Sequence, residues 1–155
     1  MISSVNYLLV MAEVTVIGAT GSFDIEELKM KLQEMEVLGI DPEMVCGKDH
    51  LISAASCAIK AFTSKRNACS NLTMETMLYA SGERQISKAA DKMGIKSNNA
   101  VALVIFNENA EDIFSKLNLK QDDSILEPSE EKMMNFGISE NELHSVPEKL
   151  LFLHK

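Results

Sequence analysis

The pattern of apolar and polar residues along the chain predicts strands and amphipathic helices in an irregular order. The stretch from Val5 to Gly18 is rich in valine, leucine and isoleucine, which favours a strand or a hairpin arm, and a turn is expected at Gly18–Gly21. Asp24 is a good N-cap with a glutamate three residues later. We therefore expect an amphipathic helix from Asp24 to about Leu38, closed by Gly39.

The remainder of the chain gives clearer signals. Apolar residues at helical spacing predict a long helix from about Lys48 to Thr63, and Asn109 is expected to cap a helix that ends near Leu117. The run Ala100–Phe106 is apolar throughout, which is typical of a central strand covered on both faces. Because strands and helices do not alternate regularly, the predicted fold class is α+β, with a single domain over residues 1–155. Further helices are expected to begin at Ser129 and Ser139.

A helical hairpin from Asn67 to Lys96 is the element around which the predicted fold is organised, and its two helices are joined at Ser81-Gly82. The second helix has an apolar face at helical spacing, made of Ile86, Ala89, Ala90 and Met93. Its opposite face carries a basic stripe, made of Arg84, Lys88 and Lys92. We expect Gly94 to end this helix in the left-handed conformation, which glycine adopts without steric cost.

The distribution of charge singles out the middle of the chain. The chain as a whole carries a formal net charge of −8, which by itself argues against a nucleic-acid partner. From Lys48 to Lys96, however, eight basic residues stand against four acidic ones, so this segment carries +4. The remainder, with seven basic residues against nineteen acidic ones, carries −12. The alternatives are a chance imbalance of surface charge and a binding surface for an anionic partner.

Composition points to a reducing compartment. The three cysteines form no CxxC pair, which favours free thiols. The N-terminus lacks the positive region of a signal peptide, and no window approaches 18 uninterrupted apolar residues. We therefore expect a cytoplasmic protein that spans no membrane.

Signals for catalysis are weak. The run Val16–Gly21 follows a predicted strand and precedes a helix, as a dinucleotide-binding fingerprint does, but Asp24 stands where that fingerprint has its third glycine. Cys46 and His50 are four residues apart, which fits no common zinc spacing, and we expect His50 to have a packing role near a helix N-terminus. No motif of a hydrolase, metalloprotease or nucleotide-binding P-loop is present. The sequence predicts a protein that is not an enzyme and has no cofactor or metal.

Segments spread over nearly the whole chain carry a resemblance to a known family. They are Ile40–Gly47, His50–Ala54, Arg66-Asn67, Glu75, Leu78–Ile86, Ala89-Ala90, Gly94–Lys96, Ala100–Phe106, Phe136–Ile138 and Glu142-Leu143. In this order and spacing they resemble the family of the PRPK-binding protein (TPRKB), the small accessory subunit of the KEOPS complex, in its archaeal form. The resemblance implies a mixed sheet with flanking helices, no catalysis, and attachment to the small-lobe side of the kinase/ATPase subunit of that complex.

The same resemblance implies a role with RNA. The complex transfers threonylcarbamoyl to an adenosine beside the tRNA anticodon, and this subunit is implicated in holding tRNA by its single-stranded 3′ end. Such an end is bound by cations on its phosphates and by stacking and polar contacts to its bases. The residues expected to bind it are Lys60, Lys65, Arg66, Asn67, Ser81, Gly82, Arg84, Gln85 and Lys88. Tyr79 and Phe62 are candidates for stacking, although a core position is the simpler interpretation of each.

Contact with the kinase is expected at the start of the hairpin. Leu72 and Met74 stand where a helix begins, so that one of them can remain exposed to a partner. The expected partners are the kinase/ATPase subunit, tRNA and, indirectly, the catalytic subunit of the complex. The alternative is a kinase regulator that binds only protein and does not contact RNA.

Overall fold

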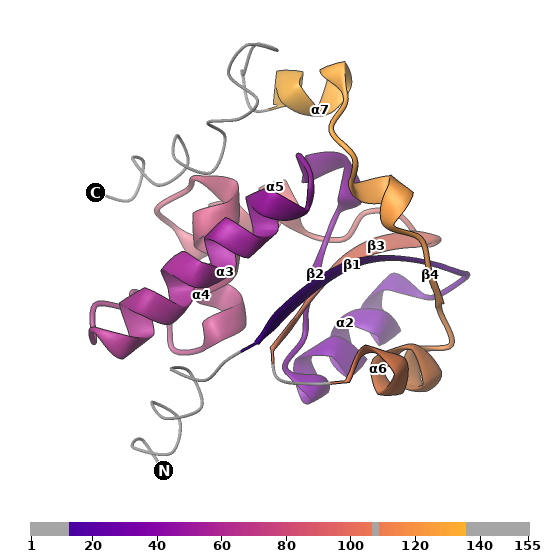
Figure 1. Cartoon of the computed structure of the whole chain (residues 1–155), viewed down its shortest axis with the longest axis horizontal. Coiled ribbons are helices and arrows are strands. Elements are labelled where there is room, and N and C mark those ends of the chain that lie inside the picture. The colour runs from indigo at the N-terminus through magenta and orange to yellow at the C-terminus, as the bar shows by residue number, and fades with distance from the viewer. Residues whose placement is uncertain (1–12, 107–108, 136–155) are drawn as a thin grey trace.

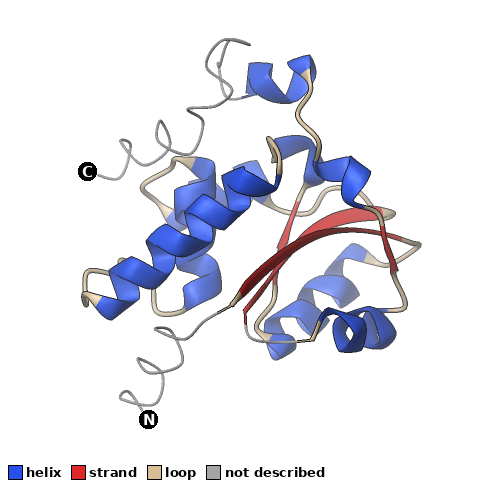
Figure 2. Cartoon of the chain, in the orientation of Figure 1, coloured by secondary structure: helices blue, strands red, loops and turns tan. Residues whose placement is uncertain are grey.

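The computed structural model describes residues 13–106 and 109–135, which form one four-stranded sheet with helices on both faces (Figures 1 and 2). The strand order is β2-β3-β1-β4, and the strands are β1 (Val14–Thr20), β2 (Leu38–Ile40), β3 (Ala100–Phe106) and β4 (Lys120–Gln121). β1 and β3 pair along their whole lengths, from Val14 opposite Phe106 to Thr20 opposite Ala100. These two strands are therefore the centre of the sheet.

One layer of helices packs on each face of the sheet. The layer with α3 (Lys48–Thr63), α4 (Leu72–Ser81) and α5 (Ile86–Met93) lies on one side, and the layer with α2 (Ile25–Met35) and α6 (Ala110–Leu117) lies on the other (Figure 1). Short 3₁₀ helices, η1 (Pro42–Met44) and η2 (Asp123–Leu126), and a final helix, α7 (Glu130–Asn135), complete the described elements. Within the described ranges, no helix has the length and apolar character needed to cross a membrane.

Two cores follow from the period-two alternation of side chains along the central strands. Val16, Ala102 and Val104 contribute to the core under α3, α4 and α5. Their strand neighbours Ile17 and Leu103 contribute to the core under α2 and α6. Because both faces of β3 are covered, its five internal residues are all buried, as an apolar run without alternation predicts.

The α+β class is confirmed, and several elements have the predicted bounds. The long helix is α3, the apolar strand is β3, and Asn109 caps α6 through its side-chain oxygen. The described strand pairs are all antiparallel, whereas the resemblance implied a mixed sheet. The expected helix at Ser129 is α7, and the one expected at Ser139 lies outside the described residues, as does most of the stretch before Val14.

Three glycine positions differ from their predicted roles. The first helix ends at Met35 with Glu36 in the left-handed conformation (φ 57°), and Gly39 lies inside β2 instead of closing the helix. Gly18 is likewise inside β1, where a Cβ atom would collide with the carbonyl oxygen of Asp122. Gly94 is extended, and its Cβ would collide with the carbonyl oxygen of Ala90. At these positions glycine permits close packing, so its conformational freedom is not what the fold requires.

The dinucleotide fingerprint has no matching structure in the described residues. Gly18 continues a strand that pairs antiparallel with β3 and β4, and its carbonyl oxygen accepts a hydrogen bond from Asp122 N–H at 2.8 Å. A dinucleotide site requires instead a glycine turn between a parallel strand and a helix. This region is therefore part of the sheet.

Candidate nucleic-acid interface

The residues expected to bind RNA lie at opposite ends of the helix pair α3–α4. The two helices run antiparallel, because His50 in the first turn of α3 hydrogen-bonds the carbonyl oxygen of Ala80 in the last turn of α4, at 2.8 Å. Residues after the end of α3 therefore lie at one end of the pair, and residues after the end of α4 lie at the other. The residues expected to bind RNA therefore form two separate clusters in space.

The first cluster, which we call the α3-end cluster, consists of Lys60, Lys65, Arg66 and Asn67, all exposed. It is built by a Schellman motif: Lys65 N–H donates to Phe62 O at 3.2 Å, and Arg66 N–H donates to Ala61 O at 2.8 Å. Lys65 takes the left-handed position of this motif, with φ 57°, where glycine is usual. The motif turns the chain sharply, so that three cations gather around the negative end of the helix dipole.

A buried carboxylate holds the loop that follows. Oε1 of Glu75, whose residue is only 3% exposed, accepts hydrogen bonds from the backbone N–H groups of Ala68 and Cys69, at 2.9 and 2.8 Å. Burial, the charge of Glu75 and a hydrogen bond to it together raise the pKa of the Cys69 thiol to about 11. Glu75 thereby fixes the backbone immediately after Arg66 and Asn67. Sequence reasoning missed this role, because an acid four residues after the N-cap Asn71 matches no standard capping pattern.

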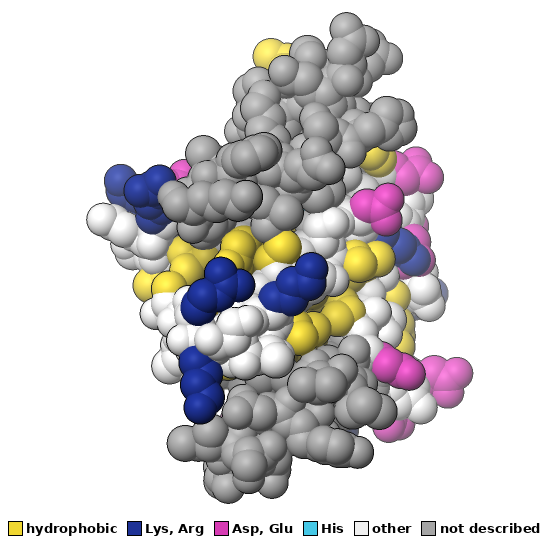
Figure 3. All heavy atoms as spheres, turned by 60° about the vertical axis from the view of Figure 1, so that its left-hand side comes forward, with side chains coloured by type: hydrophobic (Ala, Val, Ile, Leu, Met, Phe, Trp, Pro, Cys, Tyr) yellow, Lys and Arg dark blue, Asp and Glu magenta, His cyan; other side chains and the backbone are white. Residues whose placement is uncertain are grey.

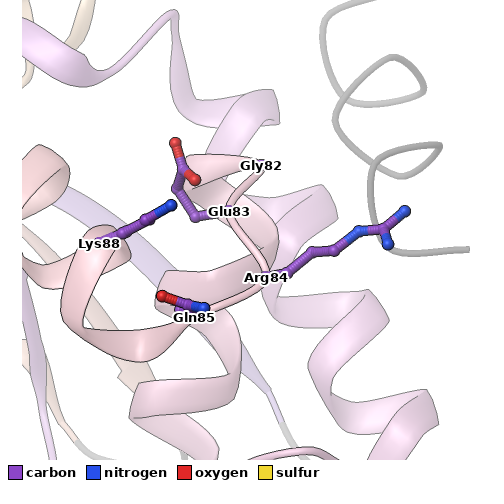
Figure 4. Close-up of a pocket in the computed structure, with 5 residues that line it drawn as sticks. All are labelled: Gly82, Glu83, Arg84, Gln85 and Lys88. Carbon is purple, nitrogen blue, oxygen red and sulfur yellow. The ribbon is translucent and has the colours of Figure 1, made fainter.

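The second cluster surrounds an open pocket of about 370 Å³ lined by Gly82, Glu83, Arg84, Gln85 and Lys88 (Figure 4). Gly82 has φ 74° and caps α4 by donating its N–H to Leu78 O at 3.1 Å. This left-handed conformation is one that glycine adopts without strain. The volume is at the lower end of the range typical of small-ligand sites, about 300–1,000 Å³. We call these five residues the α5-start pocket.

The side chains of the α5-start pocket extend in different directions. In Figure 4, Arg84 extends away from the other labelled residues, whereas Lys88 projects from the first turn of α5 on the side of Glu83. Gln85 is the N-cap of α5, but its side chain makes no capping hydrogen bond, and the first turn contains no acidic residue. The positive end of this helix is therefore uncompensated by acids on its own first turn.

Ser81, of the expected interface, and Lys92, of the predicted basic stripe, have structural roles instead. Ser81 is fully buried, and its hydroxyl donates to Leu78 O and accepts from Glu83 N–H, so it does not face a ligand. Lys92 donates its ammonium to Ser81 O at 2.8 Å, which ties the end of α5 to the end of α4. Burial lowers the pKa of Lys92, and the charge of Glu83 opposes this effect. The predicted basic stripe is thus reduced to Arg84 and Lys88. Ala90, which was expected on the buried apolar face of the same helix, is exposed.

The two aromatic candidates are half-buried. Tyr79 packs against the core under α3 and α4. Burial raises its pKa, as do the charges of Glu75 and Cys57, while that of Arg66 lowers it. The backbone of Tyr79 is in the last turn of α4. Phe62 is also half-buried, in the last turn of α3.

His50 has the packing role expected of it. Its Nδ1 accepts the Cys46 N–H at 3.1 Å, so Nε2 carries the proton that it donates to Ala80 O. Burial lowers the pKa of His50 to about 4, against a smaller opposing effect of the Ala80 hydrogen bond. Both ring nitrogens are engaged by backbone groups, and no group of three potential metal ligands occurs in the described ranges.

The expected docking residues lie at the start of α4. Leu72 and Met74 are both half-buried, and Asn71 caps the helix by accepting the Met74 N–H at 2.9 Å.

The face shown in Figure 3 combines apolar side chains with basic ones at its centre, while acidic side chains lie toward its margins. Such a surface is suited to an anionic partner that also has apolar parts.

Comparison with known proteins places the chain among kinase-binding proteins. The sequence model of the family described as "Kinase binding protein CGI-121" matches residues 22–145, which takes in every described element from α2 to α7. The regulatory protein Cgi121 of Methanocaldococcus jannaschii is 30% identical over 115 residues, covering 74% of this chain and 73% of that protein.

Proposed function

The chain belongs to the CGI-121 family of kinase-binding proteins, and from this premise we propose that it is a non-catalytic subunit of a cytoplasmic KEOPS complex. In this role it binds and regulates the kinase/ATPase subunit and, through it, is linked to the catalytic subunit. It also helps to recruit tRNA, by the single-stranded 3′ end, for the formation of threonylcarbamoyl-adenosine. Family membership and the regulatory relative support the kinase partner. The RNA role rests on the residues of this chain.

One observation carries the RNA role: the α5-start pocket presents two cations, Arg84 and Lys88, against one acid, Glu83, in a chain whose net charge is −8. An acidic protein repels bulk RNA, so exposed cations around a pocket favour a small, exposed part of the RNA. A single-stranded end offers both phosphates and unpaired bases to such a site. The α3-end cluster adds three further cations.

Gel-shift and fluorescence titrations with the purified protein test this role. We expect full-length tRNA to bind, and the same tRNA trimmed of its terminal unpaired nucleotides to bind much more weakly. If two to four phosphates are neutralised, log K should fall against log salt with a slope of about −1.5 to −3. Equal affinity for the two RNAs would contradict recruitment by the 3′ end.

A kinase regulator that binds only protein is the second candidate, favoured by the half-exposed apolar residues Leu72 and Met74 at the start of α4. It predicts co-elution with the kinase subunit and no shift of any tRNA. The absence of catalysis is tested separately, by assaying the isolated protein for turnover of ATP or of a nicotinamide cofactor. An activity that follows the protein through every purification step would contradict a non-catalytic role.

A further inference from the structure

We propose that the α3-end cluster and the α5-start pocket bind one single strand of nucleic acid simultaneously, so that the strand must have a minimum length. This inference rests on the proposed RNA role and adds to it the arrangement of the strand. Its starting point is the separation of the two clusters by the antiparallel helices α3 and α4.

The length of α4 sets the distance to be bridged. The helix has ten residues between the loop that carries Arg66 and the turn that carries Gly82. At a rise of 1.5 Å per residue, it separates the two clusters by about 15 Å. A stacked strand advances about 3.4 Å along its axis per nucleotide, so it needs about four to five nucleotide steps to reach both clusters.

Neither cluster alone has enough charge for tight binding. The α3-end cluster has three cations, and the α5-start pocket has two cations together with Glu83. Each therefore gives a few phosphate contacts at most, on a protein that is acidic overall. When one strand occupies both, the second contact becomes intramolecular, and affinity can rise by about 10²–10⁴ without any new type of interaction.

Tyr79, in the last turn of α4, is the aromatic candidate for a stacking contact with this strand. The positive charge of Arg66, in the α3-end cluster, lowers the pKa of the Tyr79 hydroxyl, against the larger opposing effect of burial. The tyrosine is half-buried and packed on the core, so its position is fixed. A fixed aromatic ring offers a stacking surface that accepts any base.

The test is a length series of fluorescently labelled single-stranded oligoadenylates, from two to eight nucleotides, titrated at constant salt. We expect weak binding up to about three nucleotides, a rise of at least about tenfold at four to six, and little gain beyond that length. A smooth increase with length, without a step, would overturn the proposal.

Two variants distinguish bridging from independent binding. Lys65→Gly removes a cation from the α3-end cluster while keeping the left-handed backbone, and Arg84→Gln removes one from the α5-start pocket. For an eight-nucleotide strand, we expect each variant to lose most of the rise in affinity that separates long oligonucleotides from short ones. The matched control is Glu36→Gly, at the left-handed position of the Schellman motif that ends α2, in the opposite layer of helices. This variant should bind every oligonucleotide of the length series as the parent protein does.

The outcomes separate this inference from the proposed RNA role. If tRNA binds through its 3′ end but the length series has no step, the RNA role holds and bridging is wrong. If each variant weakens short and long strands by the same factor, the clusters act independently and bridging is again wrong. If neither tRNA nor any oligonucleotide binds, the RNA role itself fails, and bridging fails with it.

Discussion

His50 joins the start of α3 to the end of α4, because its Nε2 donates to the carbonyl oxygen of Ala80 at 2.8 Å while its Nδ1 accepts the N–H of Cys46. The imidazole is 1% exposed, and its burial keeps it neutral against the smaller opposing effect of the Ala80 hydrogen bond. The hydrogen bond to Ala80 lies directly before the turn that forms the α5-start pocket. The protonation state of His50 is therefore linked to the stability of the helix pair that positions the site.

We expect stability to fall between pH 6.5 and about pH 4. The pKa of His50 is lowered from 6.5 to about 4 on folding, so in this range the unfolded chain binds a proton that the folded chain does not. The contribution of neutral His50 to the free energy of unfolding is complete above pH 6.5 and is lost as the pH falls toward 4. The total loss is roughly 3 kcal/mol. Urea unfolding at a series of pH values measures this loss.

The variant His50→Gln is the control for this prediction. It should be less stable than the parent at pH 7, but its free energy of unfolding should change less between pH 6.5 and 5. That range lies above the one in which Asp123 titrates, since its pKa is lowered from the ordinary carboxyl value by hydrogen bonds to Lys48 and Gly18, which outweigh its burial. An equally steep loss in the variant would show that another group is responsible.

Lys65→Gly should not destabilise the protein. Lys65 occupies a left-handed position, φ 57°, which costs a non-glycine residue about 1–2 kcal/mol. Removing this strain outweighs or balances the extra entropy of glycine in the unfolded chain, so we expect an unfolding free energy unchanged or raised by up to about 1 kcal/mol. Lys60→Gly, which removes the same charge from inside the last turn of α3, should instead lose about 1 kcal/mol. Denaturant midpoints of the two variants decide between strain and charge as the cause.

The extent to which sequence predicted this fold is clearest from its helix ends. α3 and α6 begin and end as expected, because their apolar periodicity and caps are local signals. The predicted end of α2 was wrong because the left-handed residue that follows the helix is Glu36, and glutamate gives no sequence signal for this conformation. Gly94 ends α5 as expected, but its conformation is extended and not left-handed, and a Cβ there would collide with the carbonyl oxygen of Ala90, one turn earlier in the same helix.

The arrangement of the candidate site residues in space was also not predictable from local sequence patterns. In the sequence, Lys65 and Arg84 belong to the same basic segment, Lys48–Lys96, and only nineteen positions separate them. The antiparallel return of α4 along α3 puts them at opposite ends of the helix pair, which periodicity does not reveal. Ser81 was expected to contact RNA because it is polar and lies close to the basic residues in sequence, but the fold buries its hydroxyl in the packing of α4.

Docking on the kinase is expected at the start of α4. A charge at Leu72 or Met74, introduced as Leu72→Glu or Met74→Glu, should abolish co-elution with the kinase subunit, because a carboxylate would be buried in the complex without a partner. Both residues are half-buried, so circular dichroism has to show that each variant keeps its helix content. Met30→Glu, at a 65% exposed position on the opposite layer, is the matched control and should co-elute normally. Normal co-elution of both α4 variants would place the interface elsewhere.

The last prediction compares charge reversal at two exposed cations. Arg84→Glu and Lys120→Glu change the net charge by the same amount, but Arg84 lines the α5-start pocket, whereas Lys120 lies in β4, away from both clusters. A general electrostatic effect of the acidic protein predicts equal losses of tRNA affinity for the two variants. A direct phosphate contact at Arg84 predicts a larger loss for Arg84→Glu and a slope of log K against log salt that is shallower by about 0.7, since one fewer counterion is released from the strand. Titrations of both variants over a range of salt concentrations measure the two quantities together. Matching affinities and matching slopes would remove Arg84 from the interface, even if tRNA binding itself remained.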